Sequence, residues 1–202
     1  MGALPTDRLR LLMTLVTTLR RFIRALKDAP DHFSHGWRRA AALEQLRASP
    51  MPRTILVVCH GNLCRSPYAA AAMRRDFDSA KLAVQVESAG FLGPNRPPPQ
   101  EAIAAAADRG AALDSHRSRL IGRQMLDAAD LIVVMEPRQA AAVTTRQSGA
   151  RRVVVLADFD PDPRTTRWIK DPIGQARSAF DECYDRIDRC VAELVRGLQA
   201  TR

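Results

Sequence analysis

Two side chains with matched chemistry lie in the stretch "ILVVCHGNLCRSP", which runs from Ile55 to Pro67. Cys59 supplies a thiol, and Arg65 supplies a guanidinium six residues later. A thiolate is a nucleophile, and a planar guanidinium can hold two oxygens of one phosphate group. Together they would transfer a phosphoryl group to sulfur and form a phosphocysteine, which water then hydrolyses. This chemistry requires no metal, and we expect no cofactor.

The spacing alone does not identify a site, because it recurs twice near the carboxyl end of the chain. Cys183 precedes Arg189 by six residues, and Cys190 precedes Arg196 by six. Both pairs fall in residues 175–198, where apolar side chains recur at helical spacing. Cysteines on such a stripe are typical core residues.

The surroundings of the first pair differ. Residues 54–59 are typical of a buried strand, and Pro67 is typical of the first turn of a helix that begins near Ser66. Gly61 and Asn62 between them tolerate positive φ, so the loop can curl tightly. Such a loop points backbone N–H groups inward, which creates a nest for a tetrahedral oxyanion and favours a thiolate. The GxxxxGK[ST] pattern of nucleotide-binding loops is absent.

Strands alternate with helices along the rest of the chain. Further strands are expected over residues 83–90, 130–135 and 151–159, and helices over residues 67–80, 97–110, 136–147 and 175–198. This alternation predicts an α/β fold with three layers, in which helices cover both faces of a four-stranded parallel sheet. Sites in such sheets lie beyond the carboxyl ends of the strands. The loops after Cys59, Gly90 and Phe159 should therefore share one edge.

The N-terminal segment differs in composition from the rest. Of the chain's 202 residues, the first 53 carry ten Lys/Arg against four Asp/Glu, which accounts for most of the net charge of +9. We expect residues 1–50 to form a basic amphipathic helical extension and residues 51–202 to form the domain. The four cysteines are too few for a disulfide framework and lack the spacing of a zinc site, which fits a reducing compartment.

Two interpretations of the extension stay open. In the first, its apolar stripe packs on the domain or on a second copy of the chain. In the second, the helix lies on an anionic membrane or on a partner. The apolar run over residues 11–19 is too short to span a bilayer, and no signal-peptide cleavage site follows it. We expect a cytoplasmic location, with a peripheral position at the inner membrane face as the alternative.

The stretch "VCHGNLCRSP" resembles the signature loop of the low-molecular-weight protein tyrosine phosphatases. The resemblance continues in order through "SAG" at Ser88, "HRSRLI" at His116, "DLIVVME" and "KDPIGQARSAFDECYDRI", and it covers residues 54–200. It implies hydrolysis of phosphotyrosine with Cys59 as nucleophile and Arg65 as phosphate clamp. The loop residues that it implies for substrate binding are His60, Gly61, Asn62, Leu63, Cys64 and Ser66.

The leaving oxygen needs a proton, so a carboxylic acid must lie near the loop. Three Asp-Pro pairs follow the last predicted strand, and they begin at Asp160, Asp162 and Asp171. Asp171 matches the acid of the family, which lies in an Asp-Pro step just before the final helix. The other two are typical of turns.

One position departs from the family pattern. Many members carry a tyrosine after the Asp-Pro step that helps to wall the pocket, whereas Ile173 and Gly174 follow Pro172 here. Other flat side chains that could replace it are Trp168, His60 and Phe91. Relatives that act on phosphoarginine tend to carry threonine after the loop asparagine, and Leu63 at that position favours phosphotyrosine.

Supporting roles follow only from the resemblance. Asn62 and Ser88 resemble a pair that supports the loop, and His116 resembles a histidine behind it, although each is also compatible with an ordinary turn residue. Cys64 either forms a reversible, protective disulfide with Cys59 or packs within the loop.

Two alternative functions remain at this point. A thioredoxin-coupled arsenate reductase has a similar fold and loop, and Cys183 and Cys190 would have to relay its electrons. A non-catalytic adaptor would bind phosphoproteins without hydrolysing them. For the phosphatase, the expected partner is a phosphotyrosine-containing protein such as a cognate tyrosine kinase. We expect no nucleic-acid partner.

Overall fold

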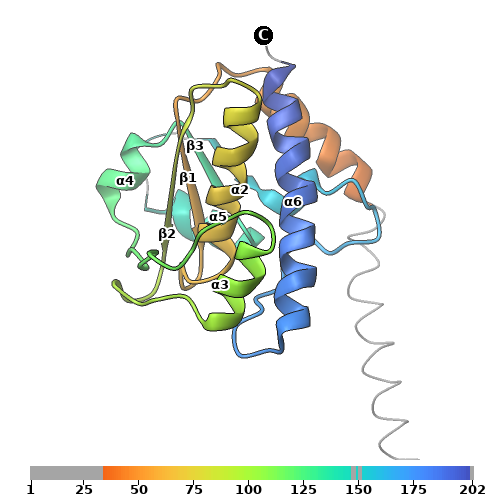
Figure 1. Ribbon diagram of the computed structural model, residues 1–202. Helices are drawn as coiled ribbons and strands as arrows, with labels where there is room; N and C mark the ends of the chain where they lie inside the picture. The colour runs from red at the N-terminus through yellow and green to blue at the C-terminus, as the bar shows by residue number, and fades with distance from the viewer. Residues whose placement is uncertain (1–33, 147–148, 150–151, 201–202) are drawn as a thin grey trace, which may run out of the picture.

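The computed structural model describes residues 34–146, 149 and 152–200. Four parallel strands form one sheet in the order β2-β1-β3-β4, which agrees with the predicted α/β fold (Figure 1). The strands are β1 (Thr54–Cys59), β2 (Gln85–Gly90), β3 (Leu131–Val134) and β4 (Arg152–Val155). The central strands β1 and β3 are almost wholly buried, as expected for a parallel sheet that is covered on both faces.

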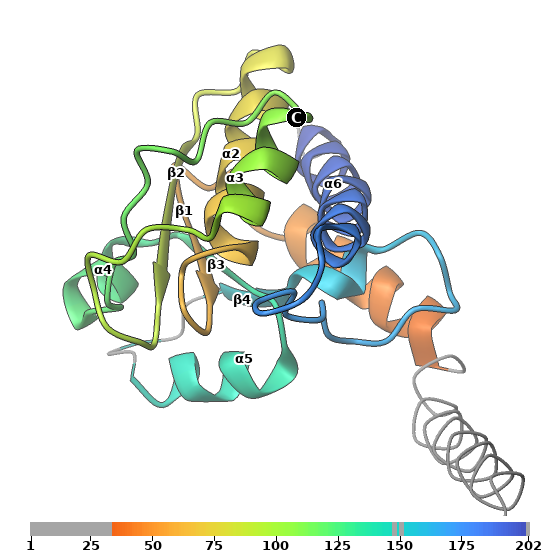
Figure 2. The same ribbon diagram turned by 60° about the horizontal axis from the view of Figure 1, so that its bottom comes forward.

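Helices lie on both faces of this sheet (Figure 2). One face carries α2 (Arg65–Ser79), α3 (Gln100–Ala107) and α6 (Arg177–Gln199), and both α2 and α3 pack against α6. The opposite face carries α5 (Pro137–Thr144), and the short helix α4 (Arg123–Ala128) contacts β1. The sequence did not predict α4, because six residues are too few to show a helical period.

The last predicted strand was too long. Residues 151–159 were expected to be extended throughout, but β4 ends at Val155 and the 3-10 helix η1 (Leu156–Phe159) follows. All four η1 residues are buried, and η1 packs against α6. Its apolar residues therefore resemble a strand in the sequence, although they fill the space between the sheet and α6.

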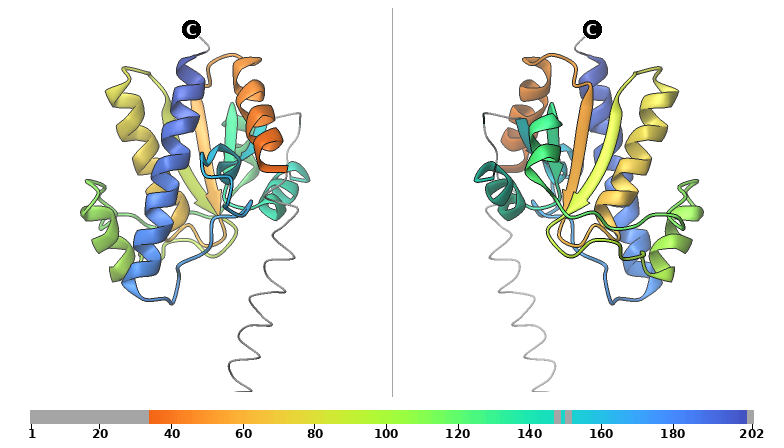
Figure 3. Two further views of the ribbon diagram at one scale, coloured as in Figure 1. Left: turned by 90° about the vertical axis from the view of Figure 1, so that its right-hand side faces the viewer. Right: turned by 90° about the vertical axis from the view of Figure 1, so that its left-hand side faces the viewer.

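Residues 34–47 are helical, and they fall within the extension that was expected to be helical over residues 1–50. They lie beside the edge strand β4 and next to α6 (Figure 3). Leu46 is fully buried, and Gly197 of α6 lies so close that an added Cβ would come within 3.0 Å of Leu43. Arg38 also pairs with Asp158 of η1 at 3.4 Å. This part of the extension therefore covers a sheet edge that would otherwise be open.

Most of the remainder of the extension, including its apolar run over residues 11–19, lies outside the described residues. Within the described residues, no helix is both long and apolar enough to cross a membrane.

The register of β1 with its neighbours brings the expected loops to one edge. Cys59 is opposite Gly90 of β2, and Val58 is opposite Val134 of β3. The strands end together, so the loop after β1, the segment after β3 and the segment before α6 meet at their carboxyl ends (Figure 3).

Candidate active site

Cys59 ends β1 at the centre of this edge, and the chain then curls around its sulfur. Asn62 adopts φ of 52°, which turns the loop back on itself before α2 begins at Arg65. The Sγ atom of Cys59 accepts hydrogen bonds from the backbone N–H of Asn62 at 3.2 Å and from Oγ of Ser66 at 3.0 Å. These donors and the N-terminus of α2 stabilise negative charge on the sulfur.

The loop also offers backbone donors to an anion. The N–H groups of residues 63–66 donate to no acceptor in the described part of the chain. Unpaired backbone donors at the start of a 15-residue helix form an oxyanion nest. The loop therefore has the geometry that was expected for binding a phosphate group.

Asn62 is the hub that holds the loop in shape. Its Nδ2 atom donates to Oγ of Ser66 and to Oγ of Ser88, both at 2.9 Å. Its Oδ1 atom accepts the backbone N–H of Arg119 at 2.8 Å, and Nε2 of His116 is hydrogen-bonded to its carbonyl oxygen at 2.8 Å. Burial lowers the pKa of His116 below its ordinary value, so the neutral ring donates here. Asn62, Ser88 and His116 thus lie together behind the loop.

Arg65 is almost wholly buried, with 1% of its surface exposed. Its Nη1 atom donates to Oε1 of Glu136 at 2.8 Å and to the carbonyl oxygen of Ile169 at 3.0 Å, and its Nη2 atom donates to Asp171. Its Nε atom is buried and has no hydrogen-bond partner among the described residues. The guanidinium is therefore fixed in position and keeps a free donor for an oxygen of a ligand.

Glu136 is a site residue that the sequence reasoning missed. Burial alone would raise its pKa, but hydrogen bonds from Arg65 and Arg138 hold that pKa below its ordinary value. Its carboxylate is therefore charged and orients Arg65. The available signal was its position directly after the strand in "DLIVVME", at the edge where sites collect.

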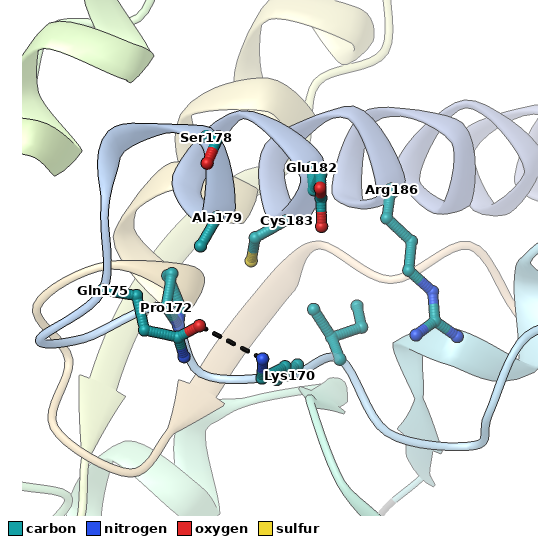
Figure 4. Close-up of a pocket in the computed structure, with 9 residues that line it drawn as sticks. Lys170, Pro172, Gln175, Ser178, Ala179, Glu182, Cys183 and Arg186 are labelled. Carbon is teal, nitrogen blue, oxygen red and sulfur yellow. Dashed lines mark hydrogen bonds between the residues drawn. The ribbon is translucent and has the colours of Figure 1, made fainter. Parts of the chain in front are cut away.

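Asp171 reaches the site from the segment before α6. That segment is attached to the sheet through Ile169, whose N–H donates to the carbonyl oxygen of Met135 at 3.0 Å. Gln175 braces it further, because its Nε2 donates to the carbonyl oxygen of Asp171 at 2.9 Å and its Oε1 accepts from Lys170 at 3.1 Å (Figure 4). The structure thus brings Asp171 together with Arg65 and Cys59.

The two competing aspartates have other surroundings. Asp160 is fully buried and pairs with Nε of Arg186 at 2.9 Å. Arg186 in turn donates to a carbonyl oxygen of the segment that leads to Asp171. Asp162 is held by its neighbour Arg164 at 3.1 Å. Neither carboxylate enters the site, and Asp160 instead supports the segment that carries Asp171.

A cavity of about 190 Å³ opens over the sulfur. It is lined by Cys59, His60, Gly61, Leu63, Cys64, Arg65, Leu92, Arg96, Asp171 and Ile173. Of the loop residues expected to bind substrate, Asn62 and Ser66 do not line this cavity, because their side chains are buried behind the loop.

The walls of the cavity are aliphatic rather than aromatic. Leu92 and Ile173 line it, with 41% and 46% of their surfaces exposed. Of the flat side chains considered as replacements for the absent tyrosine, only His60 lines this cavity, whereas Phe91 and Trp168 line separate ones. Ile173 was visible in the sequence at the position of the absent tyrosine, but Leu92 and Arg96 had no signal of their own.

The remaining cysteines are unsuited to relaying electrons. Cys183 and Cys190 are buried in α6, and Cys183 lines a separate cavity together with Lys170 and Pro172 (Figure 4). Burial raises the pKa of Cys183 to about 12 and also raises that of Cys190. Burial raises the pKa of Cys64 as well. These thiols are therefore protonated at neutral pH, and a protonated thiol is a poor nucleophile.

Comparison with known proteins agrees with this geometry. The family model described as "Low molecular weight phosphotyrosine protein phosphatase" matches residues 54–202. The low molecular weight protein-tyrosine-phosphatase Wzb of Salmonella typhi is 33% identical over 150 residues, which cover 72% of this chain and 94% of Wzb. The phosphatase Etp of Escherichia coli is 32% identical over 146 residues, with the same coverage of each chain.

Solved structures of similar proteins share this fold. Vibrio vulnificus Wzb in complex with benzylphosphonate is 26% identical, with a TM-score of 0.63 over 71% of this chain and 97% of that one. A cysteine-to-serine mutant of the YwlE arginine phosphatase, with a phosphorylated active-site serine, is 25% identical, with a TM-score of 0.67 over 74% of this chain and 97% of that one. With its family match, its relatives and its Cys59 loop taken together, the chain belongs to the low molecular weight phosphotyrosine protein phosphatases and is a protein-tyrosine-phosphatase.

Proposed function

We propose that the chain hydrolyses phosphotyrosine in proteins in two steps, with Cys59 as nucleophile and Asp171 as proton donor. In the first step, Sγ attacks phosphorus, the S–P bond forms and the P–O bond to tyrosine breaks while Asp171 gives its proton to the phenolic oxygen. In the second step, water attacks phosphorus, Asp171 takes its proton, and the S–P bond breaks to release phosphate and restore the thiolate.

The observation that carries this mechanism is the arrangement around one sulfur atom. Ser66 and the Asn62 N–H donate to Sγ at 3.0 and 3.2 Å, and Asp171 contacts the guanidinium of Arg65 at the wall of the same cavity. Arg65 and the loop N–H groups would hold the equatorial oxygens, whose charge is largest in the transition state. Ser66 would stabilise the thiolate as it leaves in the second step. A cysteine-to-serine mutant of the YwlE arginine phosphatase carries phosphate on its active-site serine, which supports a phosphorylated enzyme intermediate.

The substrate class rests on the cavity walls. Leu92 and Ile173 provide an aliphatic slot that suits a flat phenyl ring. A phosphoarginine side chain would bring positive charge next to Arg96, which lines the same cavity. Phosphoarginine is the second candidate because of the likeness to the YwlE arginine phosphatase, and Leu63 and Arg96 both count against it.

The partners that we propose are phosphotyrosine-bearing proteins, among them a cognate tyrosine kinase in the same cell. We also propose a cytoplasmic location, in which the basic N-terminal extension contacts either a second copy of the chain or the anionic inner face of the membrane. The surplus of Lys/Arg in the first 53 residues supports the membrane contact.

Hydrolysis of para-nitrophenyl phosphate and of a phosphotyrosine peptide by the purified chain tests the proposal. We expect Cys59→Ser to lower kcat about a thousandfold or more. Phosphoarginine peptide in the same assay separates the two substrate classes, and faster release of phosphate from it would reverse our choice. Persistent activity in Cys59→Ser would refute the mechanism, and arsenate reduction by the wild type would revive the reductase alternative.

A further inference from the structure

Two exposed arginines line adjoining cavities at the catalytic edge. Arg96 lines the cavity over Cys59, and Arg146 lines a second cavity of about 490 Å³. His60, Arg65 and Asp171 line both cavities, so the two open next to each other. A peptide whose phosphorylated side chain entered the first cavity would therefore place a neighbouring residue at the second.

The second cavity carries surplus positive charge. Three arginines and two carboxylates line it, and both carboxylates are already engaged. Glu136 accepts hydrogen bonds from Arg65 and Arg138, and Asp171 accepts one from Arg65. Arg146 lies over Phe91, with its guanidinium carbon 5.1 Å from the ring centre. Among the described residues, Arg146 has no carboxylate within ion-pair distance, and neither has Arg96.

Some arginines away from this edge are paired with carboxylates of the chain instead. Where the end of α3 lies against α6, Arg109 pairs with Asp185 and Arg177 pairs with Asp108. Those two pairs neutralise positive charge within the protein itself. Guanidinium groups that face open cavities beside a nucleophile are instead available to a ligand, and their field attracts negative charge.

We propose that the second cavity binds an acidic side chain that lies next to the phosphotyrosine in the same polypeptide. Arg146 is the principal partner of this side chain. Arg96 favours acidic residues at the catalytic cavity. The planar guanidinium of Arg146 presents a fork that matches a carboxylate. An aromatic neighbour is a poorer fit, because Arg146 already covers one face of Phe91. This inference rests on the proposed function and names the sequence context of its substrate.

Three peptides that differ only beside one phosphotyrosine test the proposal, with glutamate, alanine or lysine at the flanking positions. For the wild type we expect kcat/KM to be about fivefold higher for the glutamate peptide than for the alanine peptide, since each exposed ion pair contributes modestly. The preference should shrink in 0.5 M salt. Arg146→Ala should reduce the ratio, and Arg146→Glu should reverse it in favour of the lysine peptide.

Arg123→Ala is the matched control, because it removes the same charge from α4, outside both cavities, and should keep the wild-type ratio. An equal rate on all three peptides by the wild type would overturn the inference, as would an unchanged ratio in Arg146→Glu. Failure of the proposed function would look different, since none of the phosphotyrosine peptides would then be hydrolysed. Turnover of the alanine peptide by Arg146→Glu shows that this variant is folded.

Discussion

Arg65 and Glu136 form a buried ion pair, with Nη1 and Oε1 2.8 Å apart. The two residues are 71 positions apart, and the pairing of β1 with β3 brings them together. Because the pair fixes the direction of the guanidinium, we infer that Glu136 is a positioning residue for the proposed phosphate clamp.

Replacing Glu136 should therefore weaken the hold on phosphate. We expect Glu136→Ala to lower kcat/KM about tenfold to a hundredfold, because a misdirected donor stabilises the transition state poorly. Affinity for vanadate, measured as an inhibition constant, should fall in parallel. Glu136→Gln keeps an acceptor and should retain most of that affinity. Wild-type vanadate binding by Glu136→Ala would contradict the assignment.

The choice of Asp171 as the acid predicts a dependence on the leaving group. Asp171→Asn should lower kcat about a hundredfold or more on phenyl phosphate and less on para-nitrophenyl phosphate, because nitrophenolate leaves without a proton. The matched variant Asp160→Asn removes a buried carboxylate that pairs with Arg186. It should lower the Tm without creating this difference between the two substrates. The opposite pattern in these two variants would exchange the roles of the two aspartates.

The contact between Ser66 and the Cys59 sulfur should matter most in the second step. In Ser66→Ala the sulfur loses a donor that lies at 3.0 Å, so the thiolate leaves phosphorus more slowly. We expect a burst of para-nitrophenol close to one equivalent of enzyme, followed by a steady rate about tenfold below that of the wild type. Rapid-mixing absorbance measures both phases. A slow first turnover without a burst would place the effect of Ser66 in the first step.

The packing of residues 34–47 predicts that the extension stabilises the domain. Leu46→Ala should lower the free energy of unfolding by about 3 kcal/mol, because a fully buried leucine leaves a cavity. Trp37→Ala is the control on the same helix, since Trp37 is 76% exposed, and it should change little. A chain that starts at residue 51 should unfold at lower urea concentration than the full chain. Equal midpoints would show that this helix adds no stability.

The lowered pKa of His116 predicts acid sensitivity. Below its ordinary value of 6.5, the unfolded chain takes up a proton that the folded ring still refuses. Acidification through this window therefore favours unfolding, and stability returns as the pH rises above 6.5. Urea midpoints at several pH values measure the slope. His116→Gln keeps a donor for the Asn62 carbonyl without a titrating group, so its slope should be flatter. An equal slope would exclude His116 as the source.

The sequence predicted what is local and left out what depends on packing. The loop from Cys59, its curl at Asn62 and the following helix come from neighbouring residues, and the alternation of strands and helices predicted the sheet. The partnership of Arg65 with Glu136 needs the register of two strands. Likewise, Leu92 lines the catalytic cavity only because of the path of the chain after β2, which no periodicity reports.

The close contact of Gly90 with the Cys59 loop bears on how the enzyme responds to free phosphate. A Cβ at this position would lie 2.7 Å from the backbone nitrogen of Asn62 and 2.9 Å from the carbonyl oxygen of His60, so β2 braces the loop directly. Free orthophosphate presents the same tetrahedral oxygens as a phosphate ester, so it meets the same donors of the loop. Orthophosphate should therefore act as a competitive product inhibitor, and the phosphate concentration around the enzyme should set the fraction of enzyme that is open to substrate.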